Sequence, residues 1–392
     1  MVDHPARNEI VMTEQEDIDV GFEVYDLTGA NITGESLSPL QFDRTGYTPF
    51  QEFIHLLSYL PEKPKKVHNY ALSVNGRVVN DRMEKYLAHE GESSSLLKEA
   101  LKSPRHYLVA RNMELKPRNT DHFELGSFAH QAILEPSKFE KVIVEPKNNR
   151  GQINGVCNLI VFYSDLLGIP QTAVLSSLKL PALKDMLSDL ESRAINLGYT
   201  PISEDYSSII RAMKVSFKTY GGGILPKMMQ FVKTETSMYG KDASTGLKVK
   251  IRPDGLLLEE NFGVNAILSV KTTCATSVEA FMRDCAKFRY GLAEGMYLKV
   301  ASEITGRKFT ATVMIMAQTV IPYQVAVFYW DAEDLEIGKY KYQQALDIVK
   351  QCMDTDSWPG FDAKAEAGAY GIIQCKLPDY IKSELLPQYL PE

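Results

Sequence analysis

The chain has 392 residues, of which 44% are hydrophobic and 24% are charged, and its formal net charge at pH 7 is −7. This composition is ordinary for a globular protein with a buried core, and the length fits one large domain with an addition or two or three smaller domains. Because the total charge is acidic, any surface that binds phosphate groups must be local.

The sequence also argues against two other classes of protein. No run of 18 apolar residues exists, so we expect no membrane span, and the N-terminus lacks the apolar segment of a signal peptide. The five cysteines are scattered and lack CxxC spacing, which argues against zinc and against a disulfide framework. A reducing, cytoplasmic location fits this pattern best.

The N-terminal part predicts a tail followed by a small domain. Residues 1–20 are polar and acidic and are expected to be flexible. "VYDLTGANITG" and "YALSVNGRVVND" are typical of strands, and Asn75-Gly76 indicates a hairpin. Between them "TPFQEFIHLLSYL" has apolar residues at helical spacing. Residues 21–88 are therefore predicted to form a small α+β domain of unknown role.

Helical patterns dominate the middle of the chain. In "SSSLLKEALKSPRHYLVARN" the serines offer N-caps for a short helix, and Pro104 restarts the chain. "FELGSFAHQAILEPSKF" predicts a helix that ends before Pro136. Residues about 150–230 are rich in helical spacing, and Gly221 to Gly223 without a following Gly-Lys-Ser/Thr indicate a hinge or helix stop.

Strand patterns return in the last third of the chain. "FVKTETSMY", "LKVKIRPDGLLL" and "NAILSVKTT" predict three strands, and a long helix over "SVEAFMRDCAKFRYGLAEGMYLKVASEITG" follows. Two more strands flank Pro322, and "AEDLEIGKYKYQQALDIVKQCMD" predicts a last helix. This order implies an α/β (α+β) fold with a central mixed β-sheet flanked by helices.

Asp254 and Lys271 form the first candidate site. If residues 247–258 and 264–271 are neighbouring strands, the carboxylate and the amine lie near one edge of the sheet. A carboxylate can hold a divalent cation, and a lysine beside it can orient water or neutralise a phosphate, which suits phosphodiester hydrolysis. The alternative is a solvated aspartate at a turn and a lysine on an edge strand.

Two more side chains are candidates for the same site. Glu235 is an acid in the strand pattern that precedes Asp254, where its neighbours are otherwise apolar or hydroxylic. All seven histidines precede residue 131, so His130, on an apolar helix, is the imidazole expected near the sheet. A lone helical histidine is more often an ordinary core or surface residue than a ligand.

Several blocks of the chain together resemble the nuclease domain of the RecE (exodeoxyribonuclease VIII) family, within the PD-(D/E)XK superfamily. The resemblance covers roughly residues 90–365, so residues 89–392 are predicted to be the nuclease domain, with the helical segment 150–230 as an insertion. The blocks are "SSSLLKEALKSPRHYL", "LGSFAHQAILEPSKF", "ETSMYGKDASTGLKVKIRPDG", "ILSVKTT", "IPYQVAVFYWD" and "CMDTDSWPGF".

The resemblance implies an exonuclease that uses Mg²⁺ (or Mn²⁺), acts on double-stranded DNA ends and degrades one strand from 5′ to 3′. It implies His130, Glu235 and Asp254 as metal ligands, and Glu235, Asp254 and Lys271 as catalytic residues. It also implies a ring-shaped homo-oligomer, a single-strand annealing protein as recombination partner, and a phage-type origin in a bacterial cytosol.

The chain departs from the family pattern at two positions. Ser269 stands where the family has an acid, typically in "DVKTT", and Ala293 stands at the glutamine of Y-x-x-Q-x-A-x-Y, in "YGLAEGMY". In one reading Glu235, His130 and Asp254 suffice for one metal, and Ser269 is a catalytic residue that holds a ligand water. In a second reading a migrated acid replaces the missing one, with Glu259, Glu260 and Glu294 as candidates. The third reading is a catalytically degenerate fold that binds DNA or protein without cutting.

DNA contacts are expected to be electrostatic. Arg283, Lys287 and Arg289 are the preferred candidates because they start the helix that follows the Lys271 strand. For each of them, an ordinary solvated charge is the simpler alternative.

Overall fold

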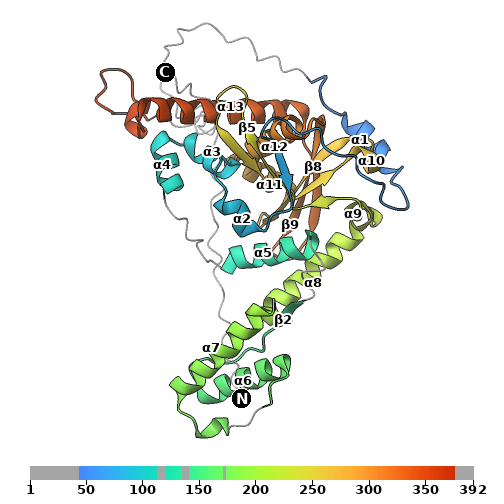
Figure 1. Ribbon diagram of the computed structural model, residues 1–392, viewed down its shortest axis with the longest axis vertical. Helices are drawn as coiled ribbons and strands as arrows, with labels where there is room; N and C mark the ends of the chain where they lie inside the picture. The colour runs from blue at the N-terminus through green and yellow to red at the C-terminus, as the bar shows by residue number, and fades with distance from the viewer. Residues whose placement is uncertain (1–43, 113–120, 135–140, 171–173, 376–392) are drawn as a thin grey trace, which may run out of the picture. The chain divides into compact units, whose positions relative to one another are not determined.

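The computed structural model describes residues 44–112, 121–134, 141–170 and 174–375 (Figure 1). The expected tail over residues 1–20 and the strand expected in "VYDLTGANITG" lie outside this range. The chain divides into two compact units, of which Ser38–Pro359 holds the sheets described below. In the other unit, the described residues 360–375 contain the 3₁₀ turn η4 (Phe361–Lys364).

A mixed sheet forms the centre of the larger unit. Within the described part of the chain it has five strands in the order β10-β9-β8-β7-β4. β8 and β9 are parallel and the other pairs are antiparallel. The strands are β4 (Lys233–Thr234), β7 (Gly255–Leu257), β8 (Asn265–Thr273), β9 (Phe309–Gln318) and β10 (Val325–Tyr329). The predicted central mixed β-sheet flanked by helices is confirmed.

Helices cover both faces of this sheet (Figure 1). Successive side chains of β8 point to opposite faces, and apolar ones on each face pack against the helices there. Ile267 joins a core with α3, α12 and α13, whereas Leu268 joins a core with α1, α5, α8 and α9. The helices of the two faces are α3 (Ser94–Ala100), α12 (Tyr290–Thr305) and α13 (Ala332–Thr355), and α1 (Phe50–Leu57), α5 (Asp121–Leu134), α8 (Glu204–Thr219) and α9 (Ile224–Met229).

Three glycines bring the backbones of α12 and α13 into contact. A Cβ atom on Gly338 would lie 2.1 Å from the carbonyl oxygen of Gly291, and one on Gly295 would lie 2.4 Å from the backbone nitrogen of Lys339. No side chain larger than hydrogen fits at these positions without moving one of the helices. The contact therefore sets how close α12 lies to α13 over residues 291–295.

A second, antiparallel sheet corrects the prediction for the N-terminal segment. It has the order β1-β5-β6, with β1 (Arg77–Val79), β5 (Ser237–Lys241) and β6 (Lys248–Ile251). Asn75 does form a turn, with φ at 66°, but β1 pairs with β5 and not with a neighbouring hairpin strand. The separate domain expected over residues 21–88 is therefore wrong for its described part, residues 44–88. Three residues of β1 cannot build a core alone, and Val78 packs against the main core instead.

Residues 150–230 are mostly helical, as their spacing predicted, and their role as an insertion in the nuclease domain stays a prediction. This segment contains α6 (Ile153–Leu167), η2 (Leu175–Ser177), α7 (Leu180–Asn196), α8, η3 (Tyr220–Gly222) and α9. Two short strands that the sequence did not predict pair in parallel. They are β2 (Val142–Val144), which precedes this segment, and β3 (Thr200–Ile202), which lies between α7 and α8. Gly221, Gly222 and Gly223 all have positive φ, which confirms the predicted helix stop.

Two predicted strands and one predicted helix are each broken in two. The strand over residues 231–239 breaks at Glu235, where φ is 54°, and the strand over residues 247–258 divides into β6 and β7 before Asp254. The long helix divides at Arg289, where φ is 51°, into α11 (Val278–Lys287) and α12. Each break falls beside a candidate site residue.

The remaining helices among the described residues are α2 (Met83–Ala88), α4 (Pro104–Asn112) and α10 (Glu259–Phe262). Among the helices that the structure describes, none is both long enough and apolar enough to span a membrane.

Candidate active site

The antiparallel pairing of β7 and β8 brings Asp254 and Lys271 together. Gly255 pairs with Leu268, so Asp254, directly before β7, lies beside the residues that follow Leu268. The Asp254 carboxylate accepts a hydrogen bond from the backbone nitrogen of Val270 at 2.5 Å, and its Oδ2 lies 3.7 Å from Lys271 Nζ. The acid and the amine are thus near enough to act on one group.

Helix α5 places His130 beside Asp254. A Cβ atom on Gly126 would lie only 2.8 Å from Thr272 Oγ1, so glycine lets the helix approach β8 closely. One turn later, His130 Nε2 lies 3.0 Å from Asp254 Oδ1, and His130 Nδ1 lies 3.9 Å from Glu235 Oε1. Burial opposes the charging of this ring, but the hydrogen bond and the charge of Asp254 outweigh it and raise the pKa of His130.

Glu235 occupies a backbone conformation that is rare for its residue type. It connects β4 and β5 with φ at 54°, in the left-handed region. Its backbone nitrogen donates to the Asp254 carbonyl at 3.2 Å, and its Oε2 accepts from Arg252 Nε at 2.6 Å. Arg252 also donates to the Asp81 carbonyl at 2.6 Å. These bonds hold the strained residue, and such strain is typical of functional sites.

His130, Glu235 and Asp254 form a donor set that fits a divalent cation. One ligand atom from each lies within 4.8 Å of the others. Burial would raise the pKa of Asp254, but Lys271 and His130 lower it to about 2, so this carboxylate is ionised. Burial disfavours the charged form of Lys271, yet the nearby carboxylates Asp254 and Glu294 keep its pKa above the usual value.

Ser269 points to a carboxylate on α12. Alternation along β8 puts Ser269 on the same face as Ile267 and Lys271, which is the α12 side of the sheet. Ser269 Oγ donates a hydrogen bond to Glu294 Oε1 at 2.8 Å. Glu294 is fully buried, and within the described residues its Oε2 has no hydrogen-bond partner. An acid therefore lies beside the position where the family pattern has one.

Burial raises the pKa of Glu294 to about 7, although Lys271 and the Ser269 hydroxyl favour the charged form. The other two candidate acids are engaged elsewhere. Glu260 pairs with Arg307 at 2.6 Å and with His68 at 3.0 Å, and Glu259 lies 3.5 Å from the same arginine. Of the three acids considered for the missing one, only Glu294 contacts Ser269.

The three residues expected to contact DNA differ in their surroundings. Arg283 and Lys287 are exposed on α11. Arg289 is half-buried and donates to the Lys98 carbonyl at 3.0 Å, so it ties the start of α12 to α3. Ala293, at the glutamine position of the family pattern, is buried in the helix packing.

Sequence reasoning missed three residues around this site. Arg252 stands two positions before Asp254 and holds Glu235, and the only available signal was its closeness to Asp254 in the sequence. Lys98 and Tyr290 also went unnoticed. The Tyr290 ring lies beside the ammonium groups of both Lys271 and Lys98. Burial and the charge of Lys271 lower the pKa of Lys98 to about 8.

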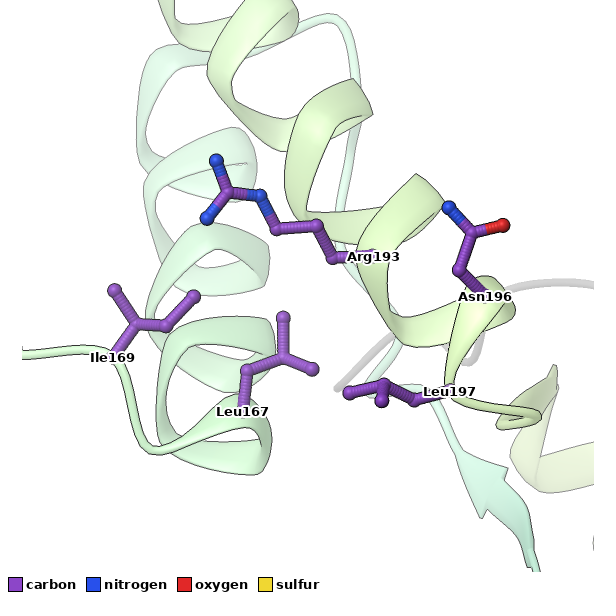
Figure 2. Close-up of a pocket in the computed structure, with 5 residues that line it drawn as sticks. All are labelled: Leu167, Ile169, Arg193, Asn196 and Leu197. Carbon is purple, nitrogen blue, oxygen red and sulfur yellow. The ribbon is translucent and has the colours of Figure 1, made fainter.

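A pocket of about 340 Å³ lies in the helical insertion and contains none of the candidate catalytic residues. Figure 2 shows its side chains on α6, on α7 and in the chain next to them. The lining residues are Leu167, Ile169, Arg193, Asn196 and Leu197.

Comparison with known families agrees with this geometry. A family model described as a PDDEXK-like domain of unknown function matches residues 93–368. The chain belongs to this family. The match confirms the predicted PD-(D/E)XK fold, while the narrower resemblance to RecE stays a prediction.

Two solved structures are similar to the chain at low identity. One is described as a "Putative exonuclease" from Eubacterium rectale, with 11% identity, a TM-score of 0.42, and coverage of 78% of this chain and 98% of that chain. The other is SSO0001, with 12% identity, a TM-score of 0.20, and coverage of 56% and 85%. Neither likeness is close enough to support a functional argument, and no curated protein matches the chain.

Proposed function

We propose that this PDDEXK-like protein is a metal-dependent DNA exonuclease. In this proposal Glu294 takes over the role of the acid that the family pattern has at position 269, where this chain has a serine. The observation that carries the proposal is the hydrogen bond of 2.8 Å between Ser269 and the buried Glu294. A carboxylate buried beside a lysine and a second carboxylate costs stability, and perturbed groups of this kind cluster at functional sites.

The residues of the candidate site would have separate roles in phosphodiester hydrolysis. His130, Glu235 and Asp254 would hold Mg²⁺ or Mn²⁺, which would polarise the scissile phosphate and stabilise its charge. Lys271 places its ammonium group beside Asp254, where it would neutralise charge on a non-bridging oxygen or orient the attacking water. Arg252 keeps one Glu235 oxygen occupied and so orients the other.

Double-stranded DNA ends, digestion from 5′ to 3′, and a role in phage-type recombination are the finer parts of the proposal. They rest on the resemblance to RecE, as do a homo-oligomeric ring and a single-strand annealing partner. Light scattering coupled to size-exclusion chromatography tests the oligomer, and a duplex blocked at one 5′ end by phosphorothioate linkages tests the direction of digestion.

The main experiment compares degradation of linear duplex DNA in Mg²⁺ and in Mn²⁺. Wild-type protein is expected to degrade the duplex, whereas Lys271→Ala and Glu294→Gln are expected to lose most activity. The double variant Ser269→Asp/Glu294→Ser moves the acid to the usual family position and is expected to recover part of it. Glu303→Gln, a change on the same helix outside the site, serves as the matched control.

Two results would overturn parts of this proposal. An intact duplex in both metals with folded wild-type protein would favour the degenerate fold that binds without cutting. Full activity of Glu294→Gln would leave the enzyme in place but remove Glu294 from its machinery.

A further inference from the structure

Two neighbouring aromatic rings, with amines at both ends, lead from Lys271 to the surface of the protein. The Tyr290 ring has Lys98 Nζ at 5.1 Å and Lys271 Nζ at 5.7 Å from its centroid. The Phe288 ring centroid lies 5.9 Å from that of Tyr290, with 32° between the ring planes. Lys287 Nζ lies 5.6 Å from the Phe288 centroid. We call Lys98, Tyr290, Phe288 and Lys287 the aromatic–lysine strip.

The break between α11 and α12 builds this strip. Arg289 takes the left-handed conformation, which ends α11 before it and lets α12 begin after it. Its guanidinium donates to the Lys98 carbonyl, which ties the break to α3. Helix α12 contacts both α3 and α11, and the three helices lie together in Figure 1. A rare backbone conformation thus holds the rings and amines in one row.

The strip is open to solvent where it leaves the site. The Phe288 side chain is 47% exposed, although α11 buries Phe281 completely on its inner side. Lys287 is also exposed, and Tyr290 and Lys98 are half-buried. A large ring held by a neighbouring ring and an amine, yet open on the outside, is available for stacking.

The charges of the strip suit a polyanion. Lys98 and Lys271 both place an ammonium group near Tyr290, and burial together with repulsion from Lys271 lowers the pKa of Lys98. A phosphate near both would offset this repulsion. Aromatic faces between lysines bind single strands in a way that tolerates any base sequence, because every base has a π-face and every nucleotide a phosphate.

We propose that the aromatic–lysine strip binds an unpaired DNA strand next to the scissile phosphate, with a base stacked on Phe288 and phosphates paired with Lys287 and Lys98. This inference rests on the proposed function, because it assumes that DNA reaches Lys271. Paired bases inside a duplex keep their faces stacked on each other, so a terminal nucleotide must leave the stack before it contacts Phe288. The strip therefore favours frayed ends over blunt ends.

The test is a binding experiment with full-length protein in EDTA, which prevents cleavage. Fluorescence anisotropy measures affinity for two labelled duplexes, one blunt and one with four unpaired nucleotides at its 5′ end. Wild-type protein is expected to bind the frayed duplex more tightly. Phe288→Ala is expected to weaken that binding by about 5-fold to 100-fold, the range for one stacked base, with little effect on the blunt duplex.

Control variants separate stacking from structural damage. Phe50→Ala removes a phenylalanine of similar exposure, 50%, on α1 outside the strip, and is expected to bind both duplexes as wild type does. Phe288→Trp keeps a stacking face and is expected to retain the preference for the frayed end. Lys287→Gln is expected to weaken binding of the frayed end at low salt, with an effect that shrinks as salt rises.

The inference is overturned if Phe288→Ala binds both duplexes as wild type does, or weakens both equally, or if wild type binds neither. These results are distinct from failure of the proposed function. A protein that cuts no DNA but loses the frayed-end preference in Phe288→Ala keeps the inference, whereas an active nuclease without that loss keeps only the proposed function.

Discussion

Replacement of Glu294 by glutamine is expected to stabilise the metal-free protein at alkaline pH while it removes activity. The glutamine keeps the size of the side chain and an oxygen that accepts from Ser269 Oγ. It removes the charge from a side chain that is fully buried. The same substitution therefore has opposite effects on folding and on the chemistry that we propose.

The magnitude follows from the pKa of Glu294. Burial raises that pKa from 4.5 to about 7. The folded protein thus holds this proton more tightly than the unfolded chain, so the charge costs nothing below pH 4.5 and its full cost is present above pH 7. A rise of roughly 2.5 pH units corresponds to about 3 kcal/mol, most of which develops between pH 5 and pH 8.

Urea unfolding in EDTA at pH 5 and pH 8 measures this difference. At pH 5 the wild-type carboxyl is protonated, so Glu294→Gln should have nearly the wild-type free energy of unfolding. At pH 8 it should be more stable than wild type by about 2 to 3 kcal/mol. Glu303→Gln should gain less than Glu294→Gln at pH 8, because Lys299 partly offsets the burial that raises the pKa of Glu303.

Metal addition gives the second half of the assay. Mn²⁺ should raise the melting temperature of wild type more than that of Glu294→Gln, because a cation near Glu294 favours the ionised carboxylate. Nuclease activity should fall by at least about 10-fold to 100-fold. The reasoning is refuted if the variant loses the same stability at both pH values, or if it gains stability at pH 8 and keeps full activity.

Three further predictions concern the parts that hold the site. Arg252→Met should lower the free energy of unfolding by about 3 to 5 kcal/mol, since it leaves the buried Glu235 without its partner at 2.6 Å, and should reduce activity. Urea unfolding checks the first effect, and a loss below 1 kcal/mol would contradict it. Gly338→Ala should cost at least about 1 to 3 kcal/mol, because its Cβ would meet the Gly291 carbonyl, and an unchanged melting temperature would show that α12 and α13 separate without cost. His130→Ala should reduce a preference for Mn²⁺ over Mg²⁺ in calorimetric titrations, because Mg²⁺ favours oxygen ligands over an imidazole nitrogen; an equal loss of affinity for both ions would argue against ligation by His130.

The sequence by itself determined the kind of fold and many of its elements. Apolar residues at helical spacing predicted α1 and α13, and caps and prolines predicted the limits of α3 and the end of α5. The apolar strand patterns predicted β8, β9 and β10. These features depend on side-chain period and on local backbone bonding, which a short stretch of sequence carries in full.

The sequence also pointed to His130, Glu235, Asp254 and Lys271, through a pattern shared with a nuclease family. The structure brings these four side chains together. It also gives the serine at position 269 a specific neighbour. Glu294 had been one of three acids near in sequence, and only the packing of α12 on β8 separates it from Glu259 and Glu260.

Tertiary structure alone decided the breaks in the backbone and the partners across the sheets. Glu235 and Arg289 adopt left-handed conformations that their residue types disfavour, and hydrogen bonds from distant segments accompany both. β1 similarly leaves its neighbours in sequence to pair with β5. Local propensity favours the opposite outcome at each place, because the stabilising contacts come from residues far along the chain, and only the folded packing brings those residues within reach.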